Sequence, residues 1–135
     1  MIPIINYHYI IPYKEVESFE FIKYNEIVNE ECYKKRILPK LPKIIDTLIN
    51  TPQSRQAVIV CNNEVNNACL ISLQFQIENK KLIVIANFRS QCEVNGRPYD
   101  TEMLQYIGTL VSRGCSTNKY KIYVNVGNYH LRTDI

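Results

Sequence analysis

Residues 68–100, ACLISLQFQIENKKLIVIANFRSQCEVNGRPYD, decide the fold of this chain. Two apolar runs, residues 68–77 and 82–88, stand on either side of the polar sequence ENKK, a pattern typical of a hairpin between two strands. On the first strand, alternation is expected to place five apolar side chains on one face: Cys69, Ile71, Leu73, Phe75 and Ile77. The second run is apolar on both faces over its first half, which predicts a central strand that is covered on both sides.

The second strand ends in a pair of side chains that suit an anion. Arg89 and Ser90 follow the run directly, and a guanidinium beside a hydroxyl can together donate three hydrogen bonds to a phosphate. After a turn at Gly96, Asp100 precedes a strongly periodic helix. The plain interpretation of Asp100 is an N-cap for that helix, and the functional one is a carboxylate that reads the edge of a base.

The remaining segments complete an α+β fold. In chain order the sequence predicts an edge strand or extended arm at 1–13, an imperfect helix at 15–35, a short helix from Pro42 to about residue 49, strands at 54–60 and 120–126, and a helix at 101–112. The expected architecture is a mostly antiparallel or mixed sheet with helices packed on one side. The length of 135 residues predicts one domain, residues 1–135.

Composition argues against several classes of function. The net charge is only +3, and the basic residues are spread along the chain, so no nucleic-acid polymer is expected as a partner. The chain has five cysteines with no CxxC pair and two histidines, so neither a metal site nor a disulfide framework is indicated. No signal peptide and no membrane-spanning run is recognisable, and a reduced, cytoplasmic protein is expected.

From about residue 41 to residue 132 the chain resembles thymidylate synthase and its relatives, the deoxycytidylate and cytidylate hydroxymethylases. Five landmarks stand in family order at family spacing. They are a helix that ends in Pro52 before Ser54-Arg55, Cys69 five residues before Gln74-Phe75, the pair Arg89-Ser90, the segment from Gly96 to Asp100, and the segment from Gly127 to Arg132.

The resemblance implies a thymidylate synthase-like sheet with helices on one face, paired sheet to sheet in a homodimer, and a small-molecule nucleotide as partner. It assigns Arg89 and Ser90 to the nucleotide phosphate, with Arg55 reaching across the dimer to the partner's phosphate. It assigns Asp100 and Asn128 to the base. His130 and Arg132 fall at the positions that bind the sugar, and Cys69 falls at the catalytic cysteine.

Several positions depart from the family pattern. Asp100 replaces the asparagine that reads uracil, as in the cytosine-specific hydroxymethylases. The replacement favours cytosine because a carboxylate accepts a hydrogen bond from its exocyclic amine. Cys92 replaces an aspartate that contacts folate, and Arg132 replaces a tyrosine on the sugar. The sequence has no tryptophan and no recognisable counterpart of the segment that carries the general-base glutamate.

Three hypotheses follow. The first is a nucleotide-binding protein without a cofactor, such as a viral or phage protein that sequesters a nucleotide; Arg132 near the sugar favours a cyclic or 3′-phosphorylated ligand. The second is a compact folate-dependent cytidylate hydroxymethyltransferase or thymidylate synthase-type enzyme, in which Cys69 is the nucleophile and neighbouring arginines lower the pKa of its thiol. The third is an interaction protein that kept the fold and lost the pocket.

Overall fold

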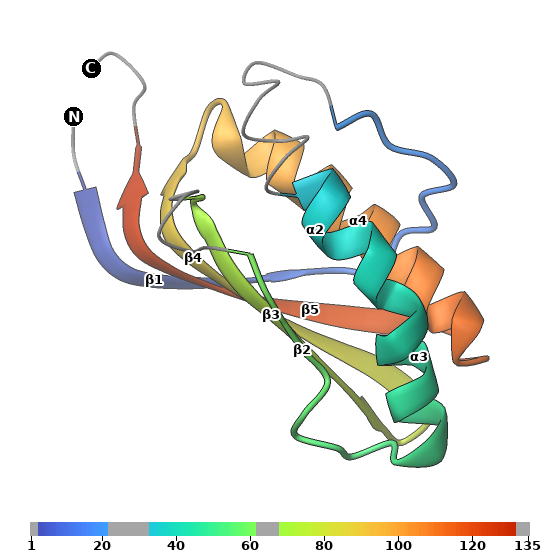
Figure 1. Cartoon of the computed structure of the whole chain (residues 1–135). Helices are drawn as coiled ribbons and strands as arrows, with labels where there is room; N and C mark the ends of the chain where they lie inside the picture. The colour runs from blue at the N-terminus through green and yellow to red at the C-terminus, as the bar shows by residue number, and fades with distance from the viewer. Residues whose placement is uncertain (1–2, 22–32, 62–67, 132–135) are drawn as a thin grey trace.

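The computed structural model of the chain describes residues 3–21, 33–61 and 68–131 (Figure 1). Its elements, in chain order, are β1 (Pro3–Ile11), α2 (Lys35–Ile37), the 3-10 helix η2 (Leu38–Lys40), α3 (Leu41–Asn50), β2 (Val58–Val60), β3 (Leu70–Glu78), β4 (Lys81–Cys92), α4 (Gly96–Gly114) and β5 (Tyr120–His130). The strands form one sheet in the order β1-β5-β4-β3-β2. No helix of the described ranges is long and apolar enough to cross a membrane.

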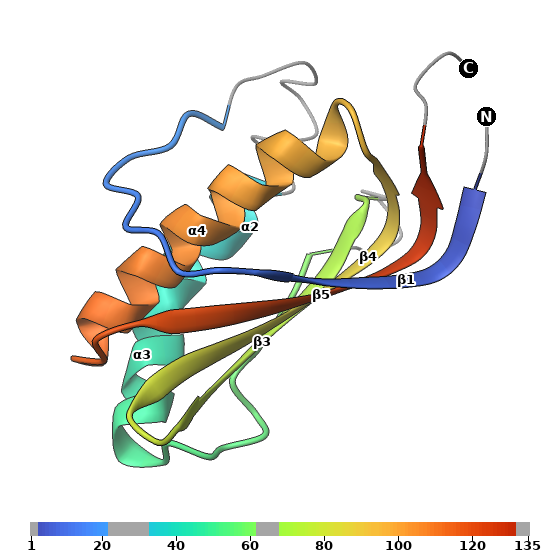
Figure 2. The same ribbon diagram turned by 180° about the vertical axis from the view of Figure 1, so that it is seen from behind.

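The sheet is mixed, and its helices cover one face. β4 and β5 are parallel and are joined by α4, whereas the other neighbouring strands pair antiparallel. Figures 1 and 2 show α3 and α4 side by side on the same face of the sheet. This architecture confirms the predicted α+β class and the central position of β4 in the sheet. The helices cover one face of β4, and the cover expected on its other face remains a prediction.

The core lies between α4 and the central strands. The apolar stripe of α4 is buried against alternate side chains of β4 and β5, as a helix with a period of 3.6 residues on a strand with a period of 2 requires. Its main members are Met103, Leu104, Ile107 and Val111 on the helix, and Leu82, Val84, Ala86, Ile122 and Val124 on the strands. The helix predicted at 101–112 is therefore confirmed, and it begins earlier, at Gly96.

The predicted hairpin between β3 and β4 is also confirmed. Its two central residues, Asn79 and Lys80, have φ angles of 52° and 62°, which is the backbone of a type I′ turn. Asparagine tolerates this left-handed region better than most residues do. The turn fixes the register in which β3 lies beside β4, and so it decides what faces Arg89 at the far end.

At that far end the strands change which side chains they bury. On β4 the buried residues are even-numbered up to Phe88, and the next buried one is Gln91. On β5 the corresponding pair is Val126 and Tyr129. The register of β3 against β4 shifts between Leu70 and Ser72, at the same level. The strands bend there, as a bulge requires, and in Figure 1 their ends curve past the N-terminus of α4.

This bend corrects one expectation for β3. Ile71 was expected to share the buried face with Leu73 and Phe75, but it is 39% exposed because the register shift falls on it. The strand predicted at 54–60 is also shorter than expected, since β2 begins at Val58.

The helix predicted at 15–35 is wrong over residues 15–21, which are not helical, and residues 22–32 lie outside the described part of the chain. Tertiary contacts with α4 replace helical hydrogen bonds here. The backbone N–H of Val16 donates to the Thr109 hydroxyl at 3.0 Å, and Phe19 packs edge-on against Tyr99 at 5.0 Å between ring centroids.

Candidate functional site

Arg89 and Cys69 lie together where β4 and β3 meet beyond the bend. The backbone N–H of Arg89 donates to the Cys69 carbonyl oxygen at 2.7 Å, and the guanidinium Nη2 lies 3.6 Å from the Cys69 Sγ. The hairpin register brings these two residues, twenty positions apart, to the same end of the sheet. A cation therefore stands beside a thiol at the edge of the site.

Ser90 and His130 form a second pair on the neighbouring parallel strands. The Ser90 Oγ lies 3.0 Å from the His130 Nε2. Within the described residues, the other ring nitrogen, His130 Nδ1, and the Asn128 Oδ1 are buried and have no hydrogen-bond partner. Because buried polar atoms are almost always paired, these two atoms are positions at which a polar ligand group would be stabilised.

Asp100 is buried in α4 and is not the N-cap of that helix. The helix begins at Gly96, so Asp100 is inside it, and its residue is only 6% exposed. The Gln91 Nε2 donates to the Asp100 Oδ2 at 3.0 Å. Burial raises the pKa of Asp100 to about 7, and the hydrogen bond from Gln91 opposes that rise. The carboxyl group is thus present in both protonation states near neutral pH.

The thiol of Cys69 is not activated. Burial raises its pKa above the ordinary value; the Arg89 guanidinium opposes this, and the nearby Asp100 carboxylate adds to it. Arg89 does lower the pKa of this thiol, as predicted for a neighbouring arginine, but its effect does not decide the net shift. Desolvation outweighs the cation, and the thiol stays protonated at neutral pH.

Tyr33 lies near both Cys69 and Asp100. Its hydroxyl accepts a hydrogen bond from the backbone N–H of Leu70 at 3.2 Å. Burial raises the pKa of Tyr33 above its ordinary value, and both Asp100 and Cys69 lie near enough to raise it further. The phenol is neutral, so Asp100 faces two uncharged acidic groups.

An aromatic cluster of Tyr7, Tyr9 and Tyr129 lies beside the first turn of α4. The rings of Tyr7 and Tyr129 stack with centroids 4.2 Å apart, and the Arg97 guanidinium lies 3.8 Å above the Tyr9 ring centroid. Arg97 also donates to the Tyr129 hydroxyl at 3.0 Å. The sequence did not single out these residues; the alternation of Tyr7 and Tyr9 along a strand was the only local signal.

Two of the sequence-predicted site residues are not tested by this single chain, since Arg55 was predicted to reach the phosphate of a partner copy. Arg55 is exposed in the loop before β2. In the same loop, the Pro52 carbonyl oxygen accepts a hydrogen bond from the backbone N–H of Ile77, near the opposite end of β3. Arg132 lies outside the described residues. The structure brings the others to one end of the sheet: Cys69, Arg89, Ser90, Asp100, Asn128 and His130.

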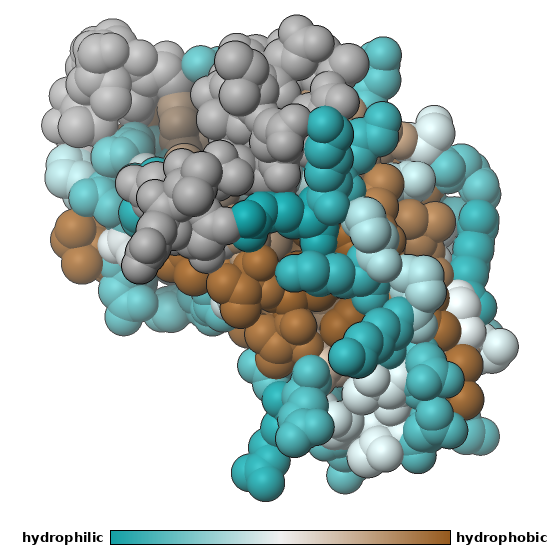
Figure 3. Space-filling model, in the orientation of Figure 1, coloured by the Kyte–Doolittle hydropathy of each residue, from teal (hydrophilic) through white to brown (hydrophobic). Residues whose placement is uncertain are grey.

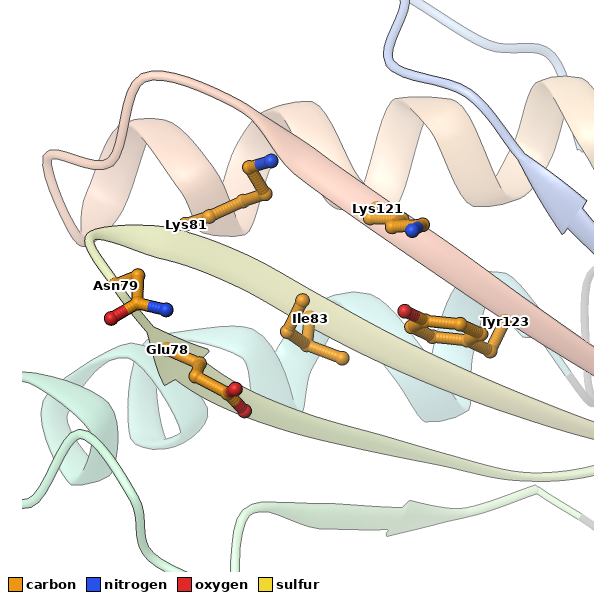
Figure 4. A pocket seen from close by; sticks show the side chains of 6 residues that line it. All are labelled: Glu78, Asn79, Lys81, Ile83, Lys121 and Tyr123. Atoms are coloured by element: carbon orange, nitrogen blue, oxygen red, sulfur yellow. The ribbon is translucent and has the colours of Figure 1, made fainter.

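A cavity of about 300 Å³ lies elsewhere, on the open face of the sheet beside the hairpin turn. It is lined by Glu78, Asn79, Lys81, Ile83, Lys121 and Tyr123, and Figure 4 shows these side chains coming from β3, β4, β5 and the turn between β3 and β4. Lysines and a tyrosine at an open surface do not by themselves form a binding site. Among the described residues no group of three or more His, Cys, Asp and Glu side chains could hold a metal ion.

No curated protein matches the sequence of this chain significantly. Its structure is similar to the crystal structure of thymidylate synthase from T4 phage, with a TM-score of 0.66 and 17% sequence identity. The match covers 78% of this chain and 39% of that one, so the chain spans about two fifths of the enzyme's length. The family model described as thymidylate synthase matches residues 14–134, which is most of the sequence. This chain therefore belongs to the thymidylate synthase family.

Proposed function

We propose that the chain is a nucleotide-binding protein in which Arg89 and Ser90 bind a phosphate, Asp100 reads the base and His130 binds the sugar. The observation that supports this most is the convergence at one end of the sheet. A cation, a hydroxyl–imidazole pair and a buried carboxyl group come from β4, β5 and α4 to the same region. Asn128 is proposed to contact the base, since its Oδ1 is buried without a partner among the described residues.

The state of Cys69 supports binding over catalysis. Nucleophilic attack on a pyrimidine ring requires a thiolate, and the pKa of this thiol is raised by its burial. Cys92, which is half-buried and paired in register with His130, offers a thiol where the family pattern has a carboxylate for folate. A thiol is a weaker hydrogen-bond acceptor than a carboxylate, which supports the proposal of nucleotide binding without that cofactor.

The finer ligand proposal is a cyclic or phosphorylated nucleotide that the protein sequesters. It rests on the arginine at position 132, which places an additional cation near the end of β5 in the sequence. An arginine in that position suits a second phosphate group, because its planar fork can donate two parallel hydrogen bonds.

The proposed function is tested by identifying small molecules that co-purify with the protein by mass spectrometry, followed by calorimetric titration. Arg89→Ala removes charge-assisted hydrogen bonds to the phosphate and is expected to weaken nucleotide binding about 10- to 100-fold. Arg113→Ala is the matched control, because Arg113 pairs with Glu15 and Glu17 near the other end of α4. If the parent protein binds no nucleotide, or if Arg89→Ala binds nucleotide as tightly as the parent does, the result would favour an interaction protein that has lost the pocket.

The alternative is a folate-dependent pyrimidine methyl- or hydroxymethyltransferase. The contact between Arg89 and the Cys69 sulfur favours it, because a cation beside a thiol is one element of an activated nucleophile. Release of tritium from carbon 5 of a labelled nucleotide, lost in Cys69→Ala, would support turnover. Under the binding proposal, Cys69→Ala retains nucleotide affinity and no tritium is released.

We also propose that two copies pair through the open face of the sheet. Side chains there form two rows that cross the strands in register. One row is a chain of hydrogen bonds that joins Ser72, Asn87, Asn125 and His8. The other includes Val58, Ile85, Tyr123 and Ile10. Figure 3 shows hydrophobic side chains gathered where β2 and β3 lie. Val58 and Val60 of β2 are exposed. An open sheet face that carries exposed apolar side chains is stabilised when a second copy of the chain covers it.

A further inference from the structure

Within the described residues, the carboxyl group of Asp100 is held at one of its two oxygens. Gln91 donates to Oδ2 at 3.0 Å, and the structure gives Oδ1 no hydrogen bond to the rest of the described chain. Both residues are buried: Gln91 is 3% exposed and Asp100 is 6% exposed. The side chain of Asp100 therefore has a fixed orientation, in which one oxygen is occupied inside the protein.

Tyr9 fixes the direction in which Gln91 points. The Tyr9 hydroxyl donates to the Gln91 Oε1 at 2.7 Å, so the amide oxygen faces Tyr9 and the amide nitrogen faces Asp100. Burial raises the pKa of Tyr9 above its ordinary value, so the phenol retains its proton throughout the physiological range. The Arg97 guanidinium, 3.8 Å above the ring centroid, holds the ring in place.

We propose that Tyr9 and Gln91 determine base specificity by reserving the Oδ1 of Asp100 for the exocyclic group of a bound pyrimidine. This inference rests on the proposed function, in which Asp100 reads the base. An ionised Oδ1 accepts a hydrogen bond from an amino group, as on cytosine. A protonated Oδ1 donates a hydrogen bond to a keto group, as on uracil. The same pocket thus favours an amino-pyrimidine at higher pH and a keto-pyrimidine at lower pH.

The titration of Asp100 itself, and not that of the groups around it, changes the charge at this position near neutral pH. From the other elements Asp100 faces Tyr9 of β1, Gln91 of β4, Tyr33 before α2 and Cys69 before β3, with the Arg97 cation behind the Tyr9 ring. Arg89 acts on Cys69, at 3.6 Å. Burial raises the pKa values of Tyr9, Tyr33 and Cys69, so these three groups remain neutral. The Asp100 carboxyl, with a pKa of about 7, changes charge near neutral pH.

The test is calorimetric titration with cytidine and uridine 5′-monophosphate at pH 6 and pH 8. With a pKa of about 7, the ionised fraction of Asp100 rises from roughly one tenth to nine tenths over this range. The ratio of cytidine to uridine affinity is therefore expected to rise by up to about 100-fold. The phosphate titrates alike in both nucleotides, so the ratio removes its effect.

Two variants examine the positioning. Gln91→Leu removes the donor that stabilises the ionised carboxylate, so the cytidine preference at pH 8 is expected to fall by about 10-fold. Tyr9→Phe leaves Gln91 in place without its anchor and should give a smaller change of the same sign. Tyr13→Phe is the matched control, because Tyr13 packs against Tyr120, outside this hydrogen-bond chain. An affinity ratio that is the same in the parent, Gln91→Leu and Tyr9→Phe would overturn the inference.

A second measurement separates this inference from the proposed function. Carbon-13 NMR follows the titration of the Asp100 carboxyl group without a ligand, and Gln91→Leu is expected to move its midpoint to higher pH. An unmoved midpoint overturns the positioning by Gln91, even if nucleotides bind. Failure of the parent to bind either nucleotide overturns the proposed function and the reading of a base, whereas a midpoint that moves still supports the positioning.

Discussion

The carbonyl oxygen of Arg89 lies 3.1 Å from the position that a β-carbon on Gly127 would take. This close contact lies at the level where both β4 and β5 change the face that they bury. Any residue larger than glycine at position 127 pushes against the backbone of Arg89, which has little freedom to move.

Gly127→Ala is therefore expected to destabilise the protein by roughly 1–3 kcal/mol through steric overlap. Because the overlap displaces Arg89, nucleotide affinity is also expected to fall. Chemical denaturation and calorimetric titration of the purified variant measure the two effects. Gly96→Ala is the control near the same site: its added β-carbon would lie 3.5 Å from the nearest atom, the Gln91 Cγ, an ordinary contact. Equal effects in the two variants would contradict this account.

Local signals in the sequence predicted the elements with strong periodicity. The β3–β4 hairpin, the short helix from Leu41 to Asn50 and the apolar stripe of α4 each depend on residues close together in the chain. The pattern after the second strand pointed to Arg89, Ser90 and Asp100, and the family landmarks added Cys69, Asn128 and His130. The structure brings these residues to one end of the sheet. Their assigned roles remain proposals.

Contacts between segments that are far apart in the chain could not be predicted from the sequence, because they leave no local signal in it. The shift in buried face at Ile71 depends on how β3 pairs with β4, and a period of two carries no sign of a bulge. The hydrogen bond from Tyr9 to Gln91 joins residues 82 positions apart. The failed helix at residues 15–21 has the same cause, because Val16 and Phe19 are fixed by α4 and not by their neighbours.

The buried carboxyl of Asp100 makes stability depend on pH. Its pKa is raised from 3.8 to about 7 in the folded protein, so between these values the folded state binds more protons than the unfolded state. Its contribution to stability is present below about pH 4 and is lost as the pH rises through 7, by about 4 kcal/mol in total. Asp100→Asn is expected to remove this loss.

Thermal unfolding of the parent and Asp100→Asn from pH 5 to pH 8 measures the difference, which isolates Asp100 from the other carboxyl groups. The variant should gain stability relative to the parent as the pH rises. Glu102→Gln, a neighbouring exposed carboxylate on α4, is the control and should follow the parent. A stability difference that is constant across this range would contradict the raised pKa.

The thiol of Cys69 should react slowly and respond to Arg89. Burial raises the pKa of this thiol, and the guanidinium 3.6 Å away lowers it. Removal of the cation in Arg89→Ala is expected to move the midpoint of the pH profile for alkylation to higher pH. Mass spectrometry of iodoacetamide-treated protein gives the rate at each cysteine separately. Cys115, whose pKa is raised by burial alone, is the internal reference and should keep its profile. A midpoint at Cys69 that is lower in Arg89→Ala would show that desolvation changed more than charge.

The proposed pairing of two copies predicts the effect of a charge on the open face. Ile85 lies at the centre of the apolar row, opposite Tyr123 on β5 and Gln74 on β3. In a sheet-to-sheet dimer, Ile85→Lys buries an unpaired ammonium group at the interface, which costs several kcal/mol. The variant is expected to sediment as a monomer at micromolar concentration, where the parent sediments as a dimer. Ile49→Lys is the matched control, because Ile49 is 59% exposed on α3, which covers the opposite face of the sheet. A parent that sediments as a monomer, or an Ile85→Lys variant that remains dimeric, would show that this face does not pair.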